Sequence, residues 1–268
     1  MIAVELRKLV TRPRTWISIG LLVGLPVIVA VLVEATGLAP RPGEGPAFLS
    51  QVLSNGTLYA AAALAIVLPL FLPIAVLVVA GDAIAGEAQA GTLRYLLTRP
   101  VGRTRLLVAK LVTVVVFVLL AVIMVAGAGY ITGALLFGTQ PLPSLSGGQP
   151  LNSGQASFRI AFSMLYVGVS MLGVASFGLF LSTVTDAPLG ATLGGLAVLV
   201  SSGVLDQLGA AGSIRPYLPT HYWLSFVDLF RDPILWRDVE RGLALQAVYV
   251  VVLLGASWAA FVTRDVTS

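Results

Sequence analysis

Long apolar runs alternate with short polar segments along the chain. Each run is close to the roughly 20 residues that an α-helix needs to cross the hydrocarbon core of a bilayer. The runs occupy residues 16–33, 58–80, 106–137, 159–183, 189–208 and 243–262. The segments between them are rich in Gly, Pro and Ser, as loops are. We therefore expect an all-α membrane protein in which residues 1–268 form one domain with six transmembrane helices.

Three prolines lie inside the first two runs, at Pro26, Pro69 and Pro73. Proline removes a backbone donor and can kink or break a helix, although membrane helices tolerate it. No charged residue accompanies these prolines, so the sequence favours simple kinks over a binding site built on broken helices.

Residues 1–14 have the pattern of an amphipathic helix. One helical face carries apolar residues at Ile2, Leu6, Leu9 and Val10. Another face carries Glu5, Lys8 and Arg12. A helix of this kind lies in the membrane interface. Two interpretations stay open: a basic anchor that fixes the topology, or a helix that also touches a cytoplasmic partner.

Charge gathers between the second and third runs, in residues 82–105. A helix over residues 84–98 would place polar residues on one line: Glu87, Gly91, Arg94 and Thr98. This helix is expected to stop before Pro100, because the residue before a proline disfavours the α conformation. Glu87 could pair with Arg94, or stand in a first turn and complement the helix dipole. An interfacial anchor and a docking element for a cytoplasmic protein both fit this pattern.

The composition agrees with a lipid environment. Hydrophobic residues make up 57% of the chain and charged residues 10%, whereas a soluble domain averages about 25% charged residues. With six crossings both termini share one side, and that side holds ten of the 16 basic residues but five of the 12 acidic residues. Lys and Arg accumulate in cytoplasmic loops, so we expect cytoplasmic N- and C-termini. Topology then accounts for the net charge of +4, and no nucleic-acid partner is needed.

The residue types that catalysis requires are sparse. The chain has no Cys and a single His, His221, which excludes thiolate chemistry and a metal cluster with two histidines. Neither a GxSxG motif nor a phosphate-binding GxxxxGK[ST] loop is present. We therefore expect no enzymatic activity, metal or cofactor in this chain. The runs carry almost no ionisable residues, which disfavours an ion-coupled carrier.

Residues 86–110 read GEAQAGTLRYLLTRPVGRTRLLVAK, and this stretch resembles the cytoplasmic loop of type-2 ABC exporter permeases. The matching positions, in order, are Glu87, Gly91, Thr92, Leu96, Leu97, Pro100, Val101, Arg103 and Lys110. Residues 217–233 (YLPTHYWLSFVDLFRDP) and the ending FVTRDVTS resemble the C-terminal third of the same permeases. One departure is Ala88, where many relatives have a basic residue.

The resemblance implies a permease subunit that forms the substrate pathway of an exporter in the inner (plasma) membrane. It would pair with a second permease chain, identical or paralogous, and with two copies of a separate ABC ATPase that holds ATP and Mg. The stretch 87–98 would be a coupling helix seated in the ATPase, and residues 182–190 a second contact. The residues expected to carry this coupling are Glu87, Gly91, Thr92, Arg94, Leu96, Pro100, Arg103 and Asp186, with Glu5, Lys8 and Arg12 in an N-terminal helix that flanks the ATPase.

Residues 209–241 form an extracytoplasmic connector in this layout and resemble the short external helices of these permeases. Its aromatic residues Trp223, Phe226 and Phe230 predict either a cap over the pathway or anchors at the outer interface. The functional alternatives are a membrane scaffold for a cytoplasmic ATPase, an ion-coupled carrier and a membrane-embedded enzyme. The apolar runs favour an apolar or amphipathic substrate, such as a lipid, drug or peptide.

Overall fold

The computed structural model describes residues 1–37, 56–92, 102–139 and 151–263, and helices dominate these ranges. The α-helices are α1 (Ile2–Thr11), α2 (Pro13–Thr36), α4 (Tyr59–Val67), α5 (Phe71–Gln89), α7 (Arg103–Phe137), α8 (Ser153–Val184), α9 (Pro188–Gln207) and α10 (Trp236–Thr263). The 3-10 helices are η1 (Gly56–Leu58), η2 (Gly209–Tyr217) and η3 (Trp223–Phe230). No β-strand occurs within the ranges given above. The all-α prediction is confirmed.

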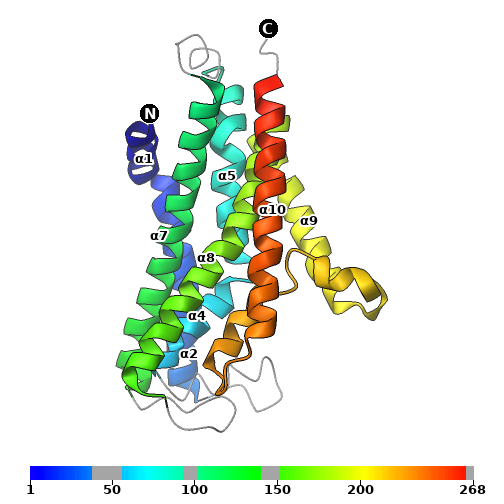
Figure 1. The fold of residues 1–268 in the computed structure, drawn as a ribbon. Helices are drawn as coiled ribbons and strands as arrows, with labels where there is room; N and C mark the ends of the chain where they lie inside the picture. The colour runs from blue at the N-terminus through cyan, green and yellow to red at the C-terminus, as the bar shows by residue number, and fades with distance from the viewer. Residues whose placement is uncertain (38–55, 93–101, 140–150, 264–268) are drawn as a thin grey trace.

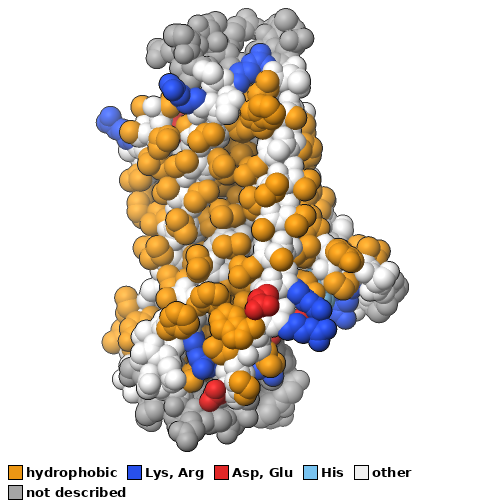
Figure 2. All heavy atoms as spheres, in the orientation of Figure 1, with side chains coloured by type: hydrophobic (Ala, Val, Ile, Leu, Met, Phe, Trp, Pro, Cys, Tyr) orange, Lys and Arg blue, Asp and Glu red, His pale blue; other side chains and the backbone are white. Residues whose placement is uncertain are grey.

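Six of these helices are long and apolar enough to cross a bilayer: α2, α5, α7, α8, α9 and α10. They form a bundle in which α9 leans away from its neighbours toward η2 (Figure 1). Figure 2 shows one face of this bundle, where hydrophobic side chains cover the middle and charged side chains lie near the ends. These features confirm the architecture of a multi-pass membrane protein.

The second predicted span, residues 58–80, is not one helix. The structure divides it into α4, which ends at Val67, and α5, which begins at Phe71. Pro69 lies in the break, and Pro73 occupies the first turn of α5, where its missing N–H costs no hydrogen bond. Helix α5 extends past the end of the predicted span to Gln89, so the charged residues that follow the apolar run also belong to this helix.

The short helix α4 is buried, and it connects α2 to α7. Tyr59 is fully buried, and its hydroxyl donates a hydrogen bond of 2.6 Å to the carbonyl oxygen of Pro26 in α2. On the other side, α8 is fastened to α5 through Ser182, which is also fully buried. The Ser182 hydroxyl donates to the carbonyl oxygen of Gly81 and accepts from the amide of Ile84. These contacts hold α5 against its neighbours and so position the end of α5.

Helix α1, the start of α7, the α8–α9 turn and the end of α10 all lie at the same end of the bundle (Figure 1). This arrangement suits six crossings. The N-terminal helix is present as predicted, at Ile2–Thr11. Its inward face differs from the apolar face of the sequence pattern, because Glu5 and Leu9 are buried whereas Ile2 and Val10 are exposed.

The helix predicted over residues 84–98 is wrong. Helix α5 ends at Gln89, and Gly91 takes the left-handed conformation, with φ of 68°. Glycine adopts this conformation without steric cost, so it ends the helix and turns the chain back. Residues 93–101, which hold Arg94, Leu96 and Pro100, lie outside the described residues.

The aromatic connector is packed differently from the prediction of interfacial anchors, whereas the cap over the pathway stays a prediction. Trp223, Phe226 and Phe230 belong to the 3-10 helix η3, and each is at least 96% buried against the bundle. They are core residues and not anchors at the membrane interface. The last turns of this connector already belong to α10, which begins at Trp236.

Candidate functional site

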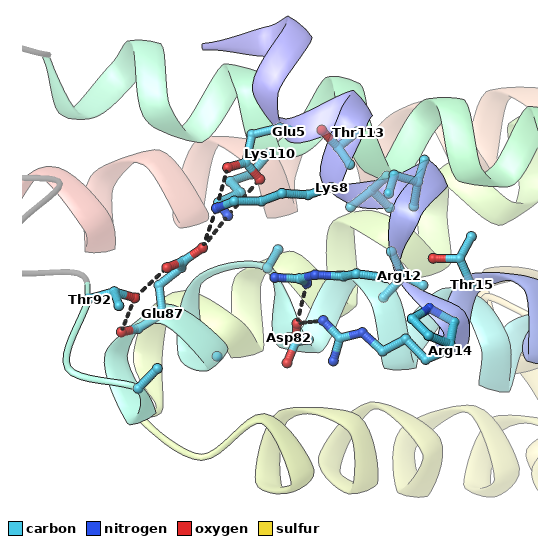
Figure 3. A pocket seen from close by; sticks show the side chains of 17 residues that line it. Glu5, Lys8, Arg12, Arg14, Thr15, Asp82, Glu87, Thr92, Lys110 and Thr113 are labelled. Carbon is cyan, nitrogen blue, oxygen red and sulfur yellow. Dashed lines mark hydrogen bonds and ion pairs between the residues drawn. The ribbon is translucent and has the colours of Figure 1, made fainter.

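Four charged side chains from three separate helices meet at the end of the bundle that carries α1 (Figure 3). The Lys8 ammonium lies 3.1 Å from a carboxylate oxygen of Glu5 and 3.2 Å from one of Glu87. The Lys110 ammonium lies 2.8 Å from the other Glu5 oxygen and 3.1 Å from Glu87. Each lysine thus contacts both acids. We call these four residues the charge ring.

The local sequence explains why these four residues meet. Glu5 and Lys8 are three residues apart on α1, so they share a helical face. Glu87 lies in the last turn of α5, and Lys110 lies about two turns into α7. The turn at Gly91 brings Thr92 back so that its hydroxyl donates to the Glu87 carboxylate and its amide donates to the Glu87 carbonyl.

The charge ring is largely removed from water. The side chains of Lys110, Glu5 and Glu87 are 7%, 11% and 13% exposed, and Lys8 is the most exposed member. Isolating one such charge from water would be costly, whereas two acids against two bases leave the ring neutral. The ring therefore ties α1 to α5 and α7 only while all four members keep their partners.

The protonation states of the two α1 residues follow from these contacts. Burial alone would raise the pKa of Glu5, but its hydrogen bonds to Lys110 and Lys8 and their positive charges lower it below its ordinary value of 4.5. Burial alone would lower the pKa of Lys8, but hydrogen bonds to Glu5 and Glu87 raise it above 10.5. Both side chains are therefore charged at neutral pH.

A second cluster lies beside the charge ring, where α1 joins α2. Arg12 and Arg14 both donate to the same carboxylate oxygen of Asp82 on α5, Arg12 over 3.3 Å. Between this cluster and the charge ring lies a hollow of about 590 Å³ (Figure 3). Its charged lining residues are Glu5, Lys8, Arg12, Arg14, Asp82, Glu87 and Lys110. We call this space the elbow hollow.

The structure brings five of the predicted site residues together: Glu5, Lys8, Arg12, Glu87 and Thr92. Glu5, Lys8, Glu87 and Thr92 are connected by ion pairs and hydrogen bonds within the chain, whereas Arg12 pairs with Asp82 beside them. Glu87 does not present its carboxylate to solvent. The proposal of a first-turn acid is wrong, because Glu87 ends α5, where the helix dipole disfavours a negative charge. Lys8 and Lys110 supply the compensating charge instead.

The remaining predicted residues lie elsewhere. The Arg103 guanidinium donates to the carbonyl oxygens of Phe261 and Val262, at 3.3 and 2.7 Å, and so caps the end of α10. Asp186 is exposed in the α8–α9 turn at the same end of the bundle. Arg94, Leu96 and Pro100 fall among the residues that are not described.

The sequence interpretation missed three residues of the site: Lys110, Asp82 and Arg14. Lys110 was named only as a position that matches the permease loop, and neither Asp82 nor Arg14 was singled out. A signal was available, because Lys110 follows four apolar residues and lies inside the apolar run 106–137. Ionisable residues in such positions usually have a charged partner.

No cluster of metal-ligating side chains occurs among the described residues. The chemistry of the site is therefore that of paired charges, which can hold segments together or release them.

Comparison with models of known families assigns the chain to one of them. The model of the family described as "Protein of unknown function (DUF2705)" matches residues 27–267, so the chain belongs to this family. Glu87, Asp82 and Lys110 lie within the matched segment, whereas the α1 half of the charge ring precedes it. No curated protein matches the chain.

Proposed function

We propose that this chain is the transmembrane permease subunit of an ATP-driven ABC exporter, acting with a separate ATPase. The observation that carries the proposal is the charge ring. It connects the segment that resembles the family's coupling loop, through Glu87, to the N-terminal helix and to α7. Six apolar helices around such a connection suit a subunit that converts movement at one end into rearrangement of a membrane pathway.

The mechanism is a shift between two states of the permease. Binding of ATP would close the partner ATPase pair and displace the segment after α5. A ligand can shift an equilibrium only by its difference in affinity for the two states. Because Glu87 is paired with both Lys8 and Lys110, displacement of the α5 end would either carry α1 and α7 along or break the ring. The first outcome passes the movement into α7, whereas the second releases α1 and α7 from the end of α5.

The partners follow from the same proposal. They are two copies of an ABC ATPase, which hold ATP and Mg, and a second permease chain, identical or paralogous. The two chains would sit in the inner (plasma) membrane with both termini in the cytoplasm, as the charge distribution favours. Arg94, Leu96, Pro100 and Asp186 remain proposed contacts to the ATPase.

The substrate class is proposed from a second cavity. A pocket of about 310 Å³ lies between the α4–α5 break, α9 and η3. Its lining is mainly aliphatic, and its polar residues are Asp206, Gln207, Thr220 and, through the indole N–H, Trp223. Irregular backbone at membrane depth is tolerated where it lines a cavity. An amphipathic substrate with a long apolar part suits such a lining.

The proposal is tested by purification from the native host followed by reconstitution. A stoichiometric ATP-binding protein should copurify, and the reconstituted complex should move an amphipathic substrate only with ATP. Glu87→Ala and Leu96→Asp should lower transport-coupled ATP hydrolysis without blocking membrane insertion. Arg237→Gln, an exposed position on α10, is the matched control and should leave coupling unchanged.

Each alternative predicts a different outcome. A membrane scaffold would also retain an ATPase, but its vesicles would show no ATP-dependent transport. An ion-coupled carrier would transport without any ATPase and would stop when the ion gradient is dissipated. Purification with no ATP-binding protein, repeated in mild detergent, would contradict the exporter proposal.

A further inference from the structure

The elbow hollow has an excess of positive charge. Its lining includes four basic side chains and three acidic ones. The charge ring is neutral by itself, so the excess comes from Arg12 and Arg14, which share the single carboxylate of Asp82. A guanidinium has five N–H donors, and each of these arginines is paired with Asp82 through one nitrogen. Both side chains also stay about half exposed, at 42% and 49%.

The surroundings of the hollow are apolar and exposed. Val10, Trp16 and Ile17, on either side of the α1–α2 junction, have exposed fractions of 53%, 46% and 61%. The Trp16 indole donates a hydrogen bond of 2.7 Å to the Val10 carbonyl, which holds this junction together. Tryptophan next to basic residues is typical of the membrane–water interface. In a bilayer crossed by α2, these features favour a position of the hollow at the height of the lipid headgroups, with apolar side chains beside it for acyl chains.

We propose that the elbow hollow binds the phosphate of an anionic phospholipid headgroup. Arg12 and Arg14 donate N–H groups to the phosphate oxygens, and the partly exposed Lys8 adds charge at the rim. Arginine suits this role because its planar donor fork matches phosphate oxygens. A volume of about 590 Å³ is within the usual range of small-ligand pockets. Basic pockets between membrane helices are a known form of headgroup recognition.

Asp82 has a defined part in this site. It holds both arginines over the hollow when no lipid is bound, and it competes with the phosphate for their N–H groups. Removal of its charge should therefore strengthen lipid binding. The proposal requires only that the chain lies in a bilayer, so it stands or falls separately from the exporter proposal.

The test is native mass spectrometry of the full chain in detergent, titrated with phosphatidylglycerol or with phosphatidylcholine of the same acyl chains. Phosphatidylglycerol should be retained preferentially. The Arg12→Gln/Arg14→Gln variant should weaken that retention by about tenfold or more, to the level of phosphatidylcholine. The matched control, Arg237→Gln/Arg241→Gln, removes the same charge from exposed positions of α10 and should retain the lipid as the unmodified chain does.

Two further measurements test the proposal independently of the double variant. Asp82→Asn should bind phosphatidylglycerol more tightly, which supports the site even if the double variant proves unstable. Inorganic phosphate added at millimolar concentration distinguishes the sources: if it displaces the lipid fully, the site takes free phosphate, and the lipid assignment fails. Equal retention of both lipids, or equal loss in the α10 control, would show general attraction to charge and overturn the proposal.

Discussion

Two charged clusters lie toward opposite ends of the bundle, and they are built in different ways. The charge ring joins residues that are 105 and 79 positions apart in the sequence. The other cluster, which we call the Asp206 cluster, joins Asp206 at the end of α9 to Arg215 and His221, which are nine and 15 positions away. Lys110 in the ring is 7% exposed, whereas the Arg215 side chain is 53% exposed.

The difference teaches what each cluster can do. A buried pair loses several kcal/mol when one partner is removed, because the other charge is left without compensation. An exposed pair is worth about 0–1 kcal/mol, since water solvates either partner. The charge ring can therefore control how α1, α5 and α7 sit together, whereas the Asp206 cluster only closes a local loop.

The largest expected effect comes from Lys110→Met. This change leaves Glu5 and Glu87 facing each other with only the more exposed Lys8 between them. We expect the free energy of unfolding to fall by about 3–5 kcal/mol, as for other broken buried pairs. Denaturation in detergent, followed by circular dichroism, measures it.

Arg105→Met is the matched control for this experiment. Arg105 lies on the same helix and also carries a positive charge, but it is exposed. Its loss should change the free energy of unfolding by about 0.5 kcal/mol or less. Equal effects of the two substitutions would mean that the ring contributes no more than a surface charge.

The parts of the fold that could be predicted are those that a single property, the length of an apolar run, determines. Apolar length alone placed five of the six spans close to their observed positions. The second span failed because Pro69 interrupts the backbone hydrogen bonds and Pro73 suits the first turn of a new helix, and neither changes the hydrophobicity. The register of α1 failed as well. A helical pattern shows which residues share a face, but the partner helices decide that Glu5 points inward.

Four of the seven charged residues of the site were predictable from the sequence, and their contacts were not. Glu5, Lys8 and Glu87 stand out in the sequence as charges beside apolar runs. Lys110, the common partner of Glu5 and Glu87, is found only when α7 is placed against α1 and α5. Gly91 was expected to continue a helix and instead ends it, and this turn brings Thr92 to Glu87.

A smaller effect is expected from Glu5→Gln. The amide keeps the shape of the side chain, and Lys110 retains Glu87 as its partner. We expect a loss of about 1–3 kcal/mol, the usual cost of removing one charged hydrogen-bond partner. The local consequence should be release of α1 from α7. Because the chain has no Cys, spin labels at Val4→Cys and Val108→Cys report the distance between these helices.

The two labels should give a narrow distance distribution in the unmodified chain and a broad one in Glu5→Gln. The matched comparison is Arg7→Gln, an exposed position on α1. It should keep the narrow distribution. A narrow distribution in both variants would show that α1 is held by Leu9 and its apolar contacts, and not by the ring.

Acid should reproduce part of this release without a mutation. The folded pKa of Glu5 lies below 4.5, so its contribution is fully present above that pH and is lost as the pH falls through the folded pKa. Lys8 has a raised pKa, so its contribution is present below pH 10.5 and is lost as the pH rises through the folded value. The labelled chain should therefore keep its narrow distribution at neutral pH and broaden below about pH 4.5.

Glu5→Gln separates this response from general acid denaturation. Its distribution is expected to be broad at neutral pH already, so acid should change it less than it changes the unmodified chain. Circular dichroism at the same pH values shows whether the helices persist. A distribution that broadens only when the helical signal is lost would assign the response to unfolding and not to Glu5.

The smallest effect is expected from Arg215→Gln in the Asp206 cluster. Asp206 keeps His221 beside its carboxylate, and water reaches the vacated position because Arg215 is more than half exposed. The free energy of unfolding should change by less than about 1 kcal/mol, and added salt should reduce even this difference, since salt screens exposed charges. A loss comparable with that of Lys110→Met would mean that the Asp206 cluster holds α9 against the bundle. The two clusters would then differ only in the sequence separation of their residues, and burial would not determine how much each contributes to the free energy of unfolding.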